Sequence, residues 1–355
     1  MKKFFLIAVA ACVALASCTK NEVAPIDPQE ITYQAVVGKS TKALINDTAY
    51  PEGVPFGTVA YKVKGGTSEL YIPVSEVSFT DADTDYWSTA TPYYWPKDGS
   101  TLSFYSYSPY KDESSNNIDV TPSAAGLTIT DYSVAGRQAT DLMVADKVTG
   151  LTDNNETIGG WKKGVSTVFR HKLAQVVAIN FQTVLGDPAA VKDYANGHDG
   201  SVGNEFRAGD KVYTVTDVTF KAIPEQGTYT NVSTEGWTTT GTATTTIEWI
   251  AGNTTPFSGG EYNTTRTTNG YLLVIPQTFV ASKQQLTINY TVKTYTGASN
   301  FATETIEKTI DLKDLHLSWD MNKKYTYTIS IGLNQIYWAP SVVAWDETGT
   351  GSATI

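Results

Sequence analysis

Most periodic stretches of this 355-residue chain alternate apolar and polar residues with a period of two. Such alternation is typical of β-strands that have one buried and one solvated face. The pattern is clear in residues 286–292 and 325–333, whereas residues 176–181 are apolar on both faces and predict a central strand. Helix signals are rare, while threonine, tyrosine and turn-forming residues are abundant. The sequence therefore predicts an all-β protein made of β-sandwiches.

The first predicted strand covers residues 31–37 and is followed by a polar segment. The apolar positions of this strand are Ile31, Tyr33, Ala35 and Val37. Gly38 ends the alternation, and Lys39 and Lys42 then offer cut sites to a trypsin-like protease. A second strand is predicted over residues 56–63. A strand on a tether that a protease can cut is either a fixed arm or a removable part of a sheet, and both interpretations stay open here.

The N-terminal sequence predicts an export signal. An apolar run over residues 4–15 follows two lysines; it is too short to span a bilayer and is typical of a secretory signal. The run ends in Leu15-Ala16-Ser17-Cys18, which resembles a bacterial lipobox. The alternative is an ordinary signal peptide with a chance cysteine. Since Cys12 lies within the signal, Cys18 is the one cysteine of the predicted mature chain, and we expect it to carry the lipid that anchors the precursor to the outer membrane.

The net charge of the chain argues against some classes of binding partner. The formal net charge is −10, and loss of two lysines with the signal makes it about −12. An acidic chain of this kind argues against nucleic acid as a partner and against docking on anionic lipid by charge. Apart from the signal, no segment predicts a transmembrane helix. The length allows two domains or one large β domain.

A domain boundary is predicted in residues 152–160, a polar and turn-rich stretch without periodicity. The alternative is a long hairpin loop inside one domain. With this boundary the chain divides into a signal peptide (residues 1–17), an N-terminal β-sandwich domain (residues 18–160) and a C-terminal β-sandwich domain (residues 161–355).

Signals of catalytic chemistry are few. The histidines are His171, His198 and His316. The sequence contains no His-Glu-x-x-His, no Gly-x-Ser-x-Gly and no phosphate-binding glycine loop. His171 precedes a buried strand and is predicted to be a hydrogen-bonded structural residue. Residues 81–85 imitate the start of a calcium loop, but Tyr86 and Pro92 stand where such a loop needs glycine and glutamate. We therefore expect no catalytic residue, no metal site and no cofactor.

Aromatic clusters allow a second interpretation. Tyr86-Trp87 and Tyr93-Tyr94-Trp95 could form a platform on which sugar rings stack. Aromatic residues at strand spacing are more often core residues or cross-strand pairs. The alternative function is therefore a surface lipoprotein that binds glycans through exposed aromatics. Such a protein would stay monomeric and lose affinity when Trp87 or Trp95 is changed.

Several stretches together resemble a known family. They are Phe56-Gly57-Thr58-Val59-Ala60-Tyr61, Tyr94-Trp95-Pro96, Leu102-Ser103-Phe104-Tyr105-Ser106-Tyr107-Ser108-Pro109, Thr140-Asp141-Leu142-Met143-Val144-Ala145, Phe169-Arg170-His171-Lys172-Leu173-Ala174-Gln175-Val176, Val274-Ile275-Pro276-Gln277, Trp319, Lys324-Tyr325-Thr326-Tyr327-Thr328-Ile329 and Val343-Ala344-Trp345. In this order and spacing they resemble the fimbrillin family of anaerobic Gram-negative bacteria, in particular the Mfa-like fimbrillins. The set covers most of the mature chain, although no one motif is decisive.

The resemblance implies two transthyretin-like β-sandwich domains in a non-enzymatic fimbrial (pilus) subunit. It implies export as a lipoprotein, transport to the outer membrane, and assembly with other subunits into a surface fimbrium. It also implies donor-strand exchange, in which a protease cuts after the first strand and a neighbour's C-terminal strand fills the groove. Residues 31–37 correspond to the removable strand and Thr41-Lys42-Ala43 to the cut site, with Lys39 as a second candidate. Lysine stands where arginine is usual, and no arginine precedes Arg137, which leaves the protease open.

The segment after Leu333 is the predicted donor strand, because of its position and composition. Its apolar positions are Ile336, Trp338, Val343 and Trp345. They form two short alternations split by Pro340, which suits a segment that leaves one subunit and pairs with the next. An ordinary final hairpin could contain the same break. The sequence leaves open whether the subunit belongs to the shaft, tip or anchor of a fimbrium, and whether it binds a host glycan or protein.

Overall fold

The computed structural model describes residues 30–38, 48–81, 86–154, 164–183, 198, 200–240, 246–257, 261–331 and 336–345. The signal peptide, Cys18, Lys39, Lys42 and most of the predicted domain boundary lie outside the described residues. The described part is built almost wholly of strands, which confirms the all-β fold class. Its single described helix, α2 (Leu312–Leu315), has four residues. No helix in these ranges has the length and apolar character needed to cross a bilayer.

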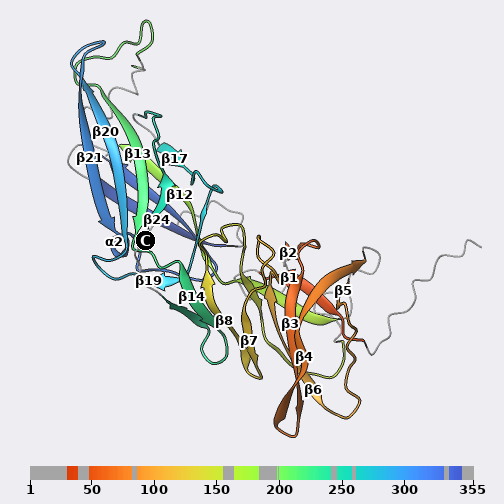
Figure 1. Ribbon diagram of the computed structural model, residues 1–355. Coiled ribbons are helices and arrows are strands. Elements are labelled where there is room, and N and C mark those ends of the chain that lie inside the picture. Colours follow the sequence, from red (N-terminus) through yellow and green to blue (C-terminus); the bar gives the residue numbers. More distant parts are fainter. Residues whose placement is uncertain are drawn as a thin grey trace, which may run out of the picture.

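The first sheet contains most of the N-terminal strands. They are β1 (Tyr33–Val37), β2 (Thr48–Ala49), β3 (Phe56–Lys64), β4 (Thr67–Asp81), β5 (Tyr86–Thr89), β6 (Thr101–Ser108), β9 (Met143–Ala145), β10 (Val148–Leu151) and β11 (Val165–His171). The hydrogen-bonded order is β10-β6-β3-β4-β5-β1-β11-β9, and β2 pairs with β1. Because β9, at one end of this order, also pairs with β6 near the other end, the sheet closes on itself around a hydrophobic core. This sheet lies at the lower right of Figure 1.

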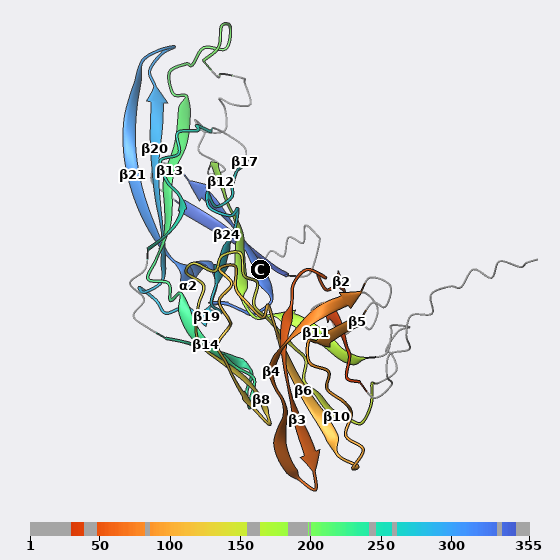
Figure 2. The ribbon, with the colours of Figure 1, turned by 45° about the vertical axis from the view of Figure 1, so that its right-hand side comes forward.

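A second sheet joins the two halves of the sequence. It is formed by β7 (Val120–Ser123), β8 (Gly126–Ser133), β14 (Gln226–Thr230) and β15 (Gly236–Thr239), in the order β15-β14-β8-β7. Figures 1 and 2 both place this sheet between the two ends of an elongated molecule. The predicted division at residues 160 and 161 stays a prediction. However, β11 and β14 follow it in sequence and pair with β1 and β8, which precede it.

Two further sheets form the C-terminal end of the molecule. The first contains β12 (Ala174–Thr183), β17 (Glu261–Thr264), β18 (Leu272–Val274), β23 (Lys323–Ile331) and β24 (Ile336–Ala344). The second contains β13 (Lys211–Lys221), β16 (Thr246–Ile250), β20 (Gln285–Tyr295) and β21 (Phe301–Asp311). A short pair, β19 (Gln277–Thr278) with β22 (Ser318–Trp319), lies apart from both. Both large sheets contribute residues to one core around Trp249, Trp319 and Tyr327, as a β-sandwich does.

Three hydrophobic cores follow from this arrangement. One lies inside the first sheet, one in the C-terminal sandwich, and the third connects the first sheet to the joining sheet and to the C-terminal part. In the third core, Leu127 and Ile129 of β8 pack in one cluster with Tyr229 of β14 and with Leu273 and Ile275. The connection between the two ends of the molecule is therefore a packed apolar contact.

Candidate functional site

The predicted removable strand, β1, lies inside the first sheet with a neighbour on each side. It runs parallel to β11, with Tyr33 opposite Val165 and Val37 opposite Phe169. On the other side it pairs with β5 at Tyr33, and with β2 near its end. The ladder continues beyond the strand, since the Gly38 N–H donates to the carbonyl of Phe169 at 2.8 Å. Removal of β1 would therefore open the sheet between β5 and β11.

The inward face of β1 fills part of the core. Tyr33 is 0 % exposed, and its ring makes edge contacts with Phe56 and Phe104, each at a centroid distance of 5.9 Å. Ile31 is also buried, while Ala35 and Val37 are half-buried against the same cluster. The four positions predicted from the alternation thus share the inward face. A protein without β1 would expose the aromatic rings that now surround Tyr33.

Asn154 holds the beginning of β1 in place, and the sequence analysis did not single it out. Its side-chain amide donates to the carbonyl of Glu30 at 2.6 Å. Its side-chain oxygen accepts from the backbone N–H of Thr32 at 3.3 Å and from the indole N–H of Trp95 at 3.0 Å. Asparagine is common in polar, turn-rich stretches such as residues 152–160, so no sequence signal marks this residue as a clamp.

Tyr50 directly follows β2 and lies beside the end of β1. The Tyr50 ring contacts Phe169 at 4.9 Å, Trp87 at 5.2 Å and Phe56 at 5.9 Å between centroids. Its hydroxyl lies 2.5 Å from the hydroxyl of Ser108 on β6, and burial raises the pKa of Tyr50. A cut at Lys39 or Lys42 leaves Tyr50 in the protein, so this end of the groove keeps its aromatic wall.

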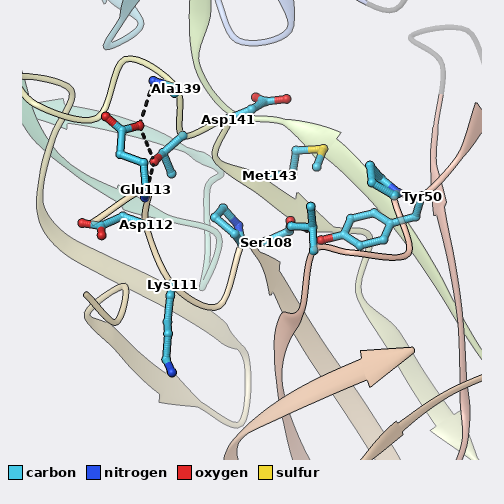
Figure 3. Close-up of a pocket in the computed structure, with 12 residues that line it drawn as sticks. Tyr50, Ser108, Lys111, Asp112, Glu113, Ala139, Asp141 and Met143 are labelled. Atoms are coloured by element: carbon cyan, nitrogen blue, oxygen red, sulfur yellow. Dashed lines mark hydrogen bonds between the residues drawn. The ribbon is translucent and has the colours of Figure 1, made fainter. Parts of the chain in front are cut away.

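A pocket of about 310 Å³ adjoins Tyr50, Ser108 and Met143, next to a loop that carries two carboxylates (Figure 3). The Glu113 carboxylate accepts from the Ala139 N–H at 2.8 Å and from the Thr140 hydroxyl at 2.9 Å. These bonds tie the loop together and leave Glu113 with a structural role.

The second carboxylate of this loop, Asp112, is also hydrogen-bonded. It accepts from Arg137 at 2.8 Å and from the backbone N–H groups of Ser114 and Asn116 at 2.9 Å. Burial alone would raise the pKa of Asp112, but these hydrogen bonds outweigh it and hold the pKa below its usual range. Both carboxylates thus stabilise the loop around the pocket.

The predicted donor strand is β24, which lies at the edge of its sheet in the order β17-β12-β23-β24. It pairs with β23 over all nine residues, from Ile336 opposite Ile331 to Ala344 opposite Lys323. Pro340 lies within this strand, so the two alternations of the sequence form one continuous strand, as in the final hairpin weighed above. A proline is tolerated there because an edge strand has one unpaired side.

The end of β24 is fixed against the first sheet. The Trp345 ring stacks on His171, which ends β11, with centroids 4.7 Å apart and an interplanar angle of 14°. Its backbone N–H donates to the carbonyl of Asn322 at 3.0 Å. The Nδ1 atom of His171 lies 2.7 Å from a carboxylate oxygen of Asp141. His171 is therefore a packed residue between the first sheet and the C-terminal strand.

The structure contradicts the interpretation that Trp87 and Trp95 form an exposed sugar platform. Trp87 is 4 % and Trp95 is 6 % exposed, and both belong to the core of the first sheet. The aromatic alternation of these strands faces the core, which is the commoner use of such spacing. Tyr94 is exposed at 47 % and stands apart from that core. Within the described residues, no cluster of three or more histidines, cysteines or carboxylates forms a metal site.

Together these features define an all-β protein that has a core strand near its N-terminus and an edge strand near its C-terminus. The sequence model described as fimbrillin-like matches residues 41–345, so the chain belongs to the fimbrillin-like family.

The chain is also similar to known proteins, among them a fimbrium subunit and a fimbrial protein of known structure. It is 23 % identical, over 93 % of each chain, to the fimbrium subunit Fim1C of Phocaeicola vulgatus. Its fold is similar to the crystal structure of a fimbrial protein from Bacteroides vulgatus, with a TM-score of 0.59 and 18 % identity over 89 % of this chain and 99 % of the other. The family membership supports a structural role in fimbriae.

Proposed function

We propose that the protein is a structural, non-enzymatic subunit of a cell-surface fimbrium and that it polymerises by donor-strand exchange after loss of β1. The observation that carries this proposal is the place of β1. It fills part of the core and is paired on both sides, yet a cut after Lys42 or Lys39 separates it from every later strand. The relative from Phocaeicola vulgatus is named a fimbrium subunit, which supports the same role.

The groove left by β1 would bind a replacement strand strongly. Each large apolar side chain that enters a core gains about 1.5–3 kcal/mol. The open backbone edges of β5 and β11 add hydrogen bonds, as in other complexes formed by strand addition. Association and ordering cost roughly 4–15 kcal/mol. The joint would also dissociate slowly, because a whole strand has to leave a packed core.

The donor in this proposal is β24. As an edge strand it has one neighbour, β23, and its departure breaks a single ladder. The long alternating strand β23 stays behind and remains paired with β12. The sandwich core would then persist around Tyr325, Tyr327 and Ile329 of β23.

The lipoprotein part of the proposal rests on the N-terminal sequence. Residues 1–17 would direct export, and a lipid on Cys18 would hold the precursor at the outer membrane until the cut releases it. The cut after Lys42 removes both the lipid anchor and β1, so release from the membrane and opening of the groove become one event. Other fimbrial subunits are then the partners, as in a polymer of like or related chains.

The test is limited digestion of the purified precursor with a lysine-specific protease. We expect Edman sequencing of the product to begin at Ala43, and negative-stain microscopy and heated gels to show polymers. The double variant Lys39→Gln/Lys42→Gln is the matched control and should stay monomeric. An assembled form that still carries Ile31 would contradict the proposal.

A truncation tests the donor. A chain that ends before Pro340 should stay folded by circular dichroism, because β23 and its pairing with β12 remain. After digestion it should form no polymers, since the open groove has no partner strand. Ladders of normal length from the folded truncation would contradict the assignment of β24. Loss of folding would show instead that the segment belongs to its own sandwich.

A further inference from the structure

We propose that β24 enters the groove of a second copy in the direction in which β1 runs, with a defined register. This inference rests on the proposed function and specifies its partner as another copy of this chain. The corresponding positions are Ile336 for Ile31, Trp338 for Tyr33, Pro340 for Ala35 and Val342 for Val37. The two strands thus present the same order of an isoleucine, an aromatic ring, a small residue and a valine.

The face of β24 that carries this pattern lies on the same side of the sheet as the buried residues of β23. Trp338 lies opposite Ile329, Pro340 opposite Tyr327 and Val342 opposite Tyr325. Directly opposite residues of an antiparallel pair share a face, and all three partners on β23 are buried. Val342 packs against the same core, and Ile336 continues the alternation. The face of β24 that is suited to burial is therefore the one that matches β1.

The proline fits the position of Ala35. Along β1 the backbone groups alternate in direction; the Thr32 carbonyl and the Gly38 N–H both bond to β11. The N–H of Ala35 consequently points to the opposite side, where β1 pairs with β5 only at Tyr33 and with β2 only at Val36 and Val37. A proline at this position leaves every hydrogen bond to β11 intact.

The reverse direction fits poorly. It would place Pro340 at Tyr33, where β1 is paired with Trp87 of β5, and the missing N–H would break that pairing. It would also place the Trp338 ring at Ala35, where overpacking destabilises a core. The match between β1 and β24 therefore holds in one direction.

Burial of the Trp338 ring favours the transfer, although the indole N–H gives up the hydrogen bond that it donates to the Asp314 carbonyl at 2.9 Å. In its own sheet Trp338 is 39 % exposed, whereas the Tyr33 position is 0 % exposed. Strand exchange would thus bury apolar surface of Trp338 that is exposed to water while β24 lies in its own subunit. The groove has to widen at its beginning, because Tyr337 takes the place of Thr32, whose side chain is 2 % exposed.

Disulfide trapping tests the register. Since Val36 lies opposite Val168 of β11, the proposal places Ser341 of the entering strand opposite Val168. Neighbouring strands are about 4.8 Å apart, within the range that a disulfide spans. In a Cys18→Ser mature background, Val168→Cys is combined in turn with a cysteine at one of four donor positions. These positions are Tyr337, Ala339, Ser341 and Val343.

The digested proteins are first imaged for polymers, then oxidised and run on a heated non-reducing gel. We expect Ser341→Cys to give the covalent ladder, at least fivefold stronger than the other three. If Tyr337→Cys gave the strongest ladder, the donor strand would run in the reverse direction. If Ala339→Cys or Val343→Cys gave it, the register would be shifted by two residues. Each of these results overturns the proposed register, while the presence of polymers still upholds the proposed function. Absence of polymers from every variant and from the parent chain overturns both.

Discussion

Replacement of Tyr33 by alanine separates the role of β1 before cleavage from its role after assembly. The ring is 0 % exposed and contacts Phe56 and Phe104 edge-on. Truncation of a buried aromatic residue to alanine costs about 3–5 kcal/mol, through lost transfer energy and the cavity left behind. We therefore expect the uncut Tyr33→Ala precursor to be less stable by this amount. In assembled protein the same change should cost nothing, because residue 33 has been removed.

The assay is urea unfolding followed by tryptophan fluorescence, because Trp87 and Trp95 lie in the same core as Tyr33. A matched control is Tyr94→Ala, which removes the same side chain from a site that is 47 % exposed; changes at such sites are usually within about 0.5 kcal/mol. If Tyr33→Ala were as mild as Tyr94→Ala in the precursor, the packing argument would be refuted. If it destabilised assembled fibres as well, β1 would still be present in them.

Three further predictions address other parts of the chain. Cys18→Ala should leave an uncleaved or unlipidated precursor by mass spectrometry, and an unmodified mature Cys18 in the wild type would contradict the lipobox. Asn154→Ala removes the hydrogen bonds that hold the beginning of β1 and leaves the Trp95 indole unpaired. The unfolding free energy of the precursor in urea should therefore fall by about 1–3 kcal/mol, and the backbone amides of residues 31–37 should exchange their hydrogens faster. Unchanged hydrogen exchange would argue against this role of Asn154. Burial alone would raise the pKa of Glu235, but the Lys172 ammonium at 2.6 Å and the hydrogen bond from the Tyr229 hydroxyl together outweigh it and keep that pKa low. At pH values above the ordinary glutamate pKa of 4.5, Glu235 therefore stabilises the folded protein, and this contribution is lost as the pH falls through the lower pKa of the folded state. Glu235→Gln should flatten this part of the pH–stability curve. An unchanged curve would refute the stabilising role of the ion pair.

The strands and their faces follow from the sequence because alternation is a local property. Residues 286–292 and 325–333 alternate, and the structure buries Leu286, Ile288 and Tyr290 on one side of β20 and Tyr325 and Tyr327 on one side of β23. The inward positions of β1 follow for the same reason. A face with period two needs no knowledge of the neighbouring strand.

The neighbours of each strand depend on distant parts of the chain, and alternation does not record them. The parallel pairing of β1 with β11 joins residues more than 120 positions apart, and β14 crosses the predicted domain boundary to join β8. The hydrogen bond from Asn154 to Glu30 and the stack of Trp345 on His171 form only because distant parts of the chain are brought together. The buried Trp87 and Trp95 illustrate the same limit, because an aromatic at strand spacing suits a core or a surface equally well until its sheet is known.

The two strands that exchange in the proposal differ in how many neighbours hold them, and this difference gives exchange a direction. β1 is paired on two sides and its Tyr33 ring contacts Phe56 and Phe104, whereas β24 is paired with one strand, β23, and leaves Trp338 partly exposed. A strand that moves from an edge into the interior of a sheet gains a second ladder and buries more apolar surface. The intact β1 blocks that gain in the precursor. In the proposed mechanism, the cut after β1 and the departure of that strand therefore make this gain available to β24 of a neighbouring subunit.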